Sequence, residues 1–87
     1  MKEFLIFIIE SLIDHPDEMR IEEQQPADGG ILYILHLAQQ DMGKIIGKSG
    51  KTIRSIRTLL MTRAAKENTR VYLELDQTDA PPPTTTV

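Results

Sequence analysis

The stretch Ile45-Ile46-Gly47-Lys48-Ser49-Gly50-Lys51-Thr52-Ile53 decides the fold of this chain, because it places two glycines three residues apart between two segments with helical patterns. Glycine at 47 can take the left-handed conformation that closes a helix, and glycine at 50 leaves no Cβ in the way of an approaching phosphate. A helix that opens near Lys51 offers unpaired N–H groups and the positive end of its dipole. The expected ligand of this loop is therefore an anion.

The segments on either side of the loop predict a short helix, a long helix and a strand. Residues 41–46 suffice for one or two helical turns, and residues 51–67 predict a longer helix. The core-facing stripe of the long helix consists of Ile53, Ile56, Leu60 and Ala64. Alternation at Val71, Leu73 and Leu75 then indicates a closing strand.

The first half of the chain predicts one helix and a hairpin. Residues 2–14 follow helical spacing, with a buried stripe of Leu5, Ile8, Ile9 and Leu12. Residues 19–22 and 31–38 read as strands on either side of the turn-rich segment 25–30. The resulting order, α-β-β-α-α-β, predicts an α+β domain whose three-stranded sheet is covered by helices on one face.

With 87 residues, the chain has room for one modest core. We expect a single domain over residues 1–77 and a disordered Pro/Thr-rich tail over 78–87. The absence of cysteine removes disulfides and most structural zinc sites. The apolar run at 4–9 is too short to span a membrane and no cleavage site follows it, so a cytoplasmic protein is expected.

Charge is distributed unevenly along the chain. The net charge is −3, which by itself argues against a nucleic-acid ligand. Residues 41–70, however, hold eight Lys or Arg against two Asp or Glu, a net +6, whereas residues 1–40 have a net −6. Because a polyanion responds to the local field within about 8–10 Å, the basic segment keeps that ligand class open.

Three other interpretations of the polar residues compete with anion binding. The loop could be an ordinary corner between helices, with solvated lysines. A nucleotide-hydrolysing P-loop would need glycine at position 45, where the chain has Ile45. His15 and His36 have no metal-ligand or catalytic spacing, and the acidic residues between 14 and 23 are typical of a solvated surface. We therefore expect no enzyme activity, no metal and no cofactor.

The glycine loop in this setting resembles the KH domains, in which a GxxG loop clamps about four nucleotides of single-stranded nucleic acid. Because a helix and a hairpin precede the loop, the order is similar to the type II arrangement. The segments Leu12–Glu18 and Asp41–Arg54 further resemble the KhpA family of small bacterial RNA-binding KH proteins. The resemblance covers about residues 2–76.

The resemblance implies RNA binding with low sequence selectivity, an RNA-chaperone role, self-association, and pairing with the KH protein KhpB (Jag) in the control of cell elongation and division. It implies that RNA faces the loop residues and their neighbours: Gly47, Lys48, Ser49, Gly50, Lys44, Ile45, Lys51, Thr52 and Arg54. No aromatic residue lies in the basic segment, so base stacking is not expected and affinity should be modest and salt-dependent.

A protein-interaction module is the main alternative to an RNA-binding domain. Such a module would keep the fold but bind a partner protein through its own apolar surface residues. The candidates are Leu59, Met61, Phe4, Phe7 and Ile34. Core packing explains some of these residues equally well. The two functions are compatible, because a dimer would carry two glycine loops and gain avidity.

Overall fold

The structure, a computed structural model, describes residues 1–76. These residues form two layers, a β-sheet and a layer of helices. The tail predicted for residues 78–87 lies outside the described residues. The elements are α1 (Lys2–Glu10), β1 (Arg20–Gln24), β2 (Ile31–His36), α2 (Gln39–Ile46), α3 (Lys51–Lys66) and β3 (Val71–Asp76), with single 3-10 turns at Pro16–Glu18 and Lys48–Gly50. The predicted α+β class and element order are confirmed.

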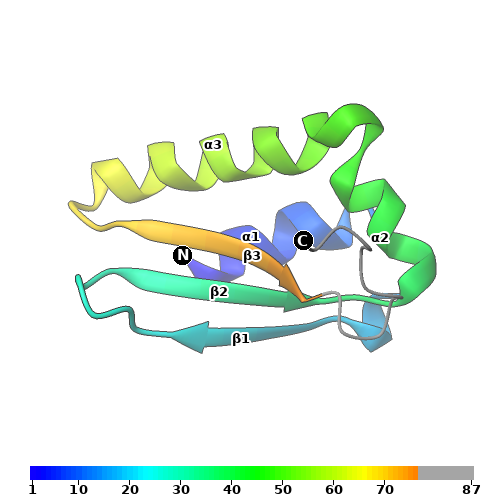
Figure 1. Cartoon of the computed structure of the whole chain (residues 1–87), viewed down its shortest axis with the longest axis horizontal. Coiled ribbons are helices and arrows are strands. Elements are labelled where there is room, and N and C mark those ends of the chain that lie inside the picture. Colours follow the sequence, from blue (N-terminus) through cyan, green and yellow to red (C-terminus); the bar gives the residue numbers. More distant parts are fainter. Residues whose placement is uncertain (77–87) are drawn as a thin grey trace, which may run out of the picture.

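The sheet has the order β1-β2-β3. Strands β1 and β2 form the predicted antiparallel hairpin, and β3 adds parallel to β2 with Tyr33 opposite Leu73. Helix α3 runs along β3 while α1 lies behind the sheet (Figure 1). A parallel pair needs a crossover connection, and α2, the glycine loop and α3 supply it. The loop therefore lies at the end of the sheet where β2 and β3 both finish.

The core forms between the sheet and the helices. All four residues of the predicted α3 stripe are buried, as are Tyr33 and Leu35 of β2. Leu5, Ile9 and Ile45 have no exposed surface and join α1 and α2 to this core. Within residues 1–76, no helix is both long enough and apolar enough to cross a membrane.

Helix α1 ends at Glu10, four residues before its predicted end. The Leu12 N–H donates to the Ile9 carbonyl at 2.9 Å, a tighter turn than an α-helical one, and the Ser11 hydroxyl donates to the Phe7 carbonyl. The turn moves the buried position by one residue. Leu12, predicted to be buried, is 40% exposed, whereas Ile13 is 8% exposed.

The Asp41 carboxylate is the one buried charged group among the described residues, and it joins the segment after α1 to α2. Its two oxygens accept the backbone N–H groups of Asp14 at 3.0 Å and His15 at 2.9 Å. Burial raises the pKa of Asp41, but these two N–H donors, together with the charges of His15 and Lys44, lower it by more, so the net pKa is below its usual value. No pattern in the sequence indicates this contact.

Replacing Asp41 with Asn turns one acceptor into a donor that faces a backbone N–H. We expect the melting temperature at pH 7, followed by circular dichroism, to fall by roughly 5–10 °C. Because the folded pKa is depressed, the stabilisation is complete above the unfolded pKa of about 3.9 and is lost as the pH falls through the folded value. The difference between D41N and wild type should therefore shrink in acid.

The matched control for D41N is Asp17→Asn, which changes an exposed aspartate in the 3-10 turn after α1. D17N should melt close to wild type at pH 7. Equal melting temperatures for D41N and wild type would contradict a structural role for the carboxylate.

Candidate nucleic-acid interface

The loop between α2 and α3 has a backbone that glycine makes possible. Gly47 has φ 74° and ψ 176°, a region essentially restricted to glycine, and Gly50 has φ 74° and ψ 15°, the left-handed helical region. Ser49 between them is also left-handed, at φ 56°. The Gly50 N–H closes the turn on the Gly47 carbonyl at 3.2 Å. Three of four consecutive residues thus have positive φ.

The two glycines are needed for different reasons. A Cβ at Gly47 would lie 2.8 Å from the Thr52 backbone nitrogen and 2.6 Å from the Thr52 Cβ, so the loop closes tightly on the first turn of α3. A Cβ at Gly50 would meet only the Arg54 guanidinium, at 3.9 Å. Gly47 is therefore required by packing inside the loop, whereas the surface at Gly50 is open to a ligand.

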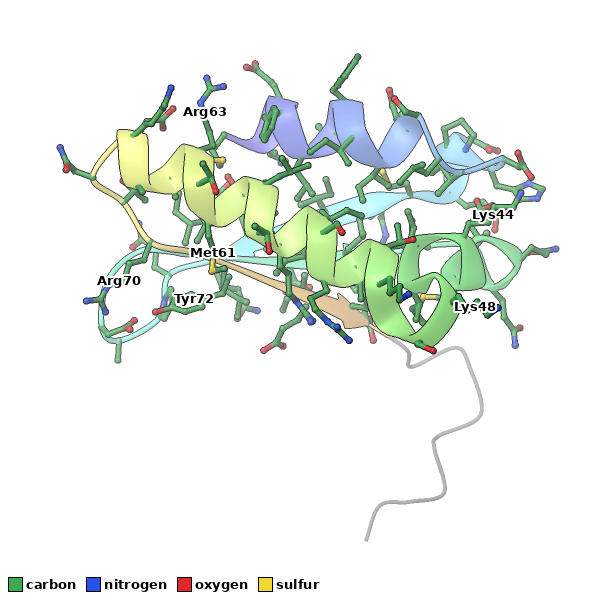
Figure 2. All side chains as sticks on the ribbon, turned by 90° about the horizontal axis from the view of Figure 1, so that it is seen from above. Lys44, Lys48, Met61, Arg63, Arg70 and Tyr72 are labelled. Carbon is green, nitrogen blue, oxygen red and sulfur yellow. The ribbon has the colours of Figure 1, made fainter. Side chains whose placement is uncertain are left out.

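Positive charge surrounds the open side of the loop. Lys48, Ser49 and Lys51 are exposed or partly exposed, and Figure 2 shows Lys48 at the end of the molecule where α3 begins. The Arg54 guanidinium donates to the Ser49 carbonyl at 3.3 Å and so braces the loop from α3. No described side chain caps the amino terminus of α3 at Gly50. These N–H groups and charges can bind a phosphate together.

Three of the nine residues predicted to face RNA are placed differently from the rest. The Lys44 ammonium contacts the Asp14 carboxylate, and this hydrogen bond raises the pKa of Lys44. Ile45 is fully buried and Thr52 is partly buried under Gly47, so both support the loop from beneath. The other six lie together in the loop and the first turn of α3: Gly47, Lys48, Ser49, Gly50, Lys51 and Arg54.

A groove beside the loop, between α3 and β3, includes residues that the sequence analysis missed. Ile46, Ile53, Arg57, Glu74 and Leu75 line it. Arg57 donates from Nε to the Leu73 carbonyl at 3.1 Å, on the edge of β3 that pairs with no described strand. Arg57 could have been found from its place one turn beyond Ile53 on α3. The β3 residues could not, because the pairing of the helix with that strand edge is tertiary.

The groove continues along α3 past Met61, and Tyr72 lines this further part. Tyr72 is 39% exposed. The basic segment itself holds no aromatic residue, but β3, which lies outside that segment in sequence, is adjacent to α3 in space and brings Tyr72 to the groove.

The five apolar residues considered for a partner lie on three different surfaces. Met61 lines the β3 side of α3, and Leu59, about 200° around the helix, lies on the other side. Ile34 is partly buried on the sheet face away from the helices. Phe4 and Phe7 belong to α1, where Phe7 is 70% exposed.

Helix α1 meets α3 on the side of α3 that carries Leu59. Phe4 packs under Arg63, whose guanidinium carbon is 5.4 Å from the ring centre. Leu59 lies one turn before Arg63 on α3, and Phe7 lies one turn after Phe4 on α1. Phe4, Phe7 and Leu59 therefore gather on one surface, which we call the α1–α3 surface.

Both histidines lie close to carboxylates of neighbouring side chains. His36 lies between the carboxylates of Glu22 and Asp76, at 3.2 and 2.7 Å, and so links all three strands. His15 approaches Glu18 at 4.0 Å. Residues 1–76 contain no group of three or more potential metal ligands.

Comparison with known proteins places this geometry in a family. Residues 2–75 match the family model described as KhpA/KhpB, KH domain. A protein of Chlamydia pneumoniae named RNA-binding protein KhpA is 53% identical over 75 residues, covering 86% of this chain and 95% of that protein. Proteins of the same name from Clostridium acetobutylicum and Listeria monocytogenes are 43% and 33% identical over 75 residues, again covering 86% of this chain, and 99% and 97% of theirs. The chain belongs to the KhpA/KhpB family of KH-domain proteins.

Proposed function

We propose that this protein binds single-stranded RNA, with the loop from Gly47 to Gly50 holding the phosphate backbone and the adjoining α3–β3 groove receiving the bases. The observation that carries the proposal is the loop itself, whose open Gly50 surface lies among Lys48, Lys51 and the uncapped start of α3. The names of the similar proteins support RNA as the ligand class. The protein would then act as an RNA chaperone or post-transcriptional regulator.

The charges predict weak sequence selectivity and strong salt dependence. The loop offers backbone N–H groups and lysines, which recognise phosphates and carry no base information. Lys44 is paired with Asp14, so it adds less to the phosphate field than Lys48 and Lys51 do. The chain as a whole has a net charge of −3, so phosphate contacts are expected on the basic segment 41–70 and not over the whole surface.

The double substitution Lys48→Asp with Ser49→Asp tests the loop directly. Both glycines remain, so the fold should persist, while a phosphate would face two carboxylates. We expect affinity for a single-stranded RNA oligonucleotide, measured by fluorescence anisotropy, to fall at least tenfold, with a shallower dependence on salt.

The control for this variant is Lys2→Asp with Ser11→Asp, which makes the same change in charge at two exposed positions of α1 and the turn after it. It should bind RNA within about twofold of wild type. Wild-type affinity in a folded K48D/S49D protein would rule out the loop as the RNA site.

Replacing Gly47 or Gly50 with alanine should reduce the stability of the protein by different amounts. Gly47→Ala forces a Cβ into Thr52 and adopts a backbone region closed to alanine, so we expect a loss of about 2–4 kcal/mol in the free energy of unfolding, measured with urea. Gly50→Ala meets open space and carries only the left-handed penalty of about 1–2 kcal/mol. RNA affinity of folded G50A should still fall, because its methyl group lies on the open surface of the loop. Equal stabilities of the two variants would contradict the separate roles.

The second candidate function is self-association, or pairing with a second KH protein of the KhpB/Jag type, to regulate cell elongation and division. The α1–α3 surface favours it, because Phe7 is 70% and Leu59 is 50% exposed there. Large exposed apolar side chains gathered on one surface are typical of interaction sites. A dimer formed there would leave the loop free and present two RNA sites.

Leu59→Lys tests this surface. If the α1–α3 surface mediates association, sedimentation of the wild type should show a species heavier than the monomer at high concentration, and L59K should shift it to the monomer. Met61→Lys is the matched control on the opposite side of α3 and should leave association unchanged. A wild type that sediments as a monomer at every concentration would contradict self-association.

A further inference from the structure

Three adjoining hollows form the groove between α3 and the edge of β3 that pairs with no described strand, and they follow one another from the glycine loop toward the other end of α3. Arg57 and Glu74 line both its first part, beside the loop, and its middle part. Met61 and Tyr72 line both the middle part and the last part, which Arg70 also borders. An extended RNA strand held at the loop can therefore pass from one hollow to the next.

Tyr72 is held in place at the far end of this groove. Its hydroxyl donates to the Asp28 carboxylate at 3.0 Å, and the Arg70 guanidinium lies 3.6 Å from the same oxygen. Asp28 belongs to the turn between β1 and β2, so a segment 44 residues away fixes the direction of the ring. Because the side chain is already ordered, stacking on it costs little conformational entropy. Figure 2 shows Met61, Arg70 and Tyr72 at the same end of the molecule.

The chemistry of this end of the groove suits a nucleobase better than a phosphate. Its walls are mostly apolar, with Leu60, Met61 and Val71 beside the tyrosine. Glu74 is the one carboxylate among the described residues that line the groove, and it disfavours a phosphate inside. Arg70 has 71% of its side chain exposed. It is placed to meet, outside the groove, the phosphate backbone of the RNA strand whose base lies inside. Base–aromatic stacking of this kind tolerates any sequence.

We propose that Tyr72, with Met61 and Arg70, forms a second RNA subsite in which the tyrosine ring stacks on a base of the strand held at the loop. The inference rests on the proposed function, because the loop supplies the first grip. This subsite extends the RNA contact from the loop and α3 to β3, on the opposite side of the groove. Affinity should then grow with RNA length beyond the segment that the loop alone can hold.

A tryptophan probe tests this subsite, because the natural chain contains none. In Tyr72→Trp the indole replaces the phenol, and stacking on a base should quench its fluorescence strongly when a 12-nucleotide RNA, about three times the length that the loop clamps, saturates the protein. Leu12→Trp is the control, since Leu12 is 40% exposed in the turn after α1 and belongs neither to the groove nor to the α1–α3 surface. Its emission should change little with the same RNA.

The RNA affinity of a variant that lacks the tyrosine ring provides a second test of the subsite. Tyr72→Ala should weaken binding of the longer RNA about fivefold or more, as the loss of one stacked base does. It should leave a tetranucleotide nearly unaffected, because the loop accounts for that binding. Arg70→Ala should reduce the salt dependence of binding for the longer RNA alone.

The outcomes separate this proposal from the function on which it rests. If K48D/S49D loses RNA binding while the indole emission of the Y72W variant stays unchanged at saturation, the loop binds RNA and the subsite is overturned. If K48D/S49D binds RNA as wild type does, the proposed function itself fails, and the subsite with it. A change in the Y72W emission that depends on protein concentration without RNA would mean that a second copy covers the groove, which also overturns the proposal.

Discussion

The close approach of the Gly47 backbone to Thr52 is the constraint on which the arrangement of this protein depends. It lets the chain leave α2 and begin α3 within a few residues, with no room for a Cβ at position 47. The crossover between the parallel strands β2 and β3 passes through this turn, so the position of α3 over the sheet follows from it. A looser turn would change the direction of α3 and, with it, the width of the groove beside β3. The fold and the candidate RNA site thus share one backbone requirement.

The uneven charge of the chain becomes a division between surfaces in the folded protein. The basic segment forms α2, the loop and α3, while the sheet face away from the helices carries Glu22 and Asp76. His36 and its two carboxylate neighbours tie the strands together on that face. A polyanion is therefore repelled from the sheet face and attracted to the end where Lys48 and Lys51 lie. This explains how a protein with a net negative charge can present a site for RNA.

Local patterns predicted much of the fold because its elements have clear periodicities. The α3 stripe of Ile53, Ile56, Leu60 and Ala64 was predicted in full. The predicted end of α1 was wrong because a single tight turn at Leu12 ends the helix, and apolar spacing alone does not reveal such a turn. The buried Asp41 was missed for a different reason: its partners, the N–H groups of Asp14 and His15, are 27 and 26 residues away. The family resemblance is confirmed, and the loop on which it is based could be found from the sequence because it is a contiguous motif.

The groove was not predictable in the same way, because it forms between two elements that meet only in the tertiary structure. Arg57 and Met61 come from α3, whereas Glu74, Leu75 and Tyr72 come from β3, and the register between helix and strand edge is not encoded in either segment alone. The same geometry separates the two sides of α3. Met61 lies in the groove and Leu59 about 200° away on the side of α1, so an RNA strand and a protein partner would use opposite sides of one helix. Because α3 directly follows the loop and lines the groove, a partner that shifts α3 against the sheet would also change the groove. RNA binding and association on this fold would then be thermodynamically coupled, without any contact between the two ligands.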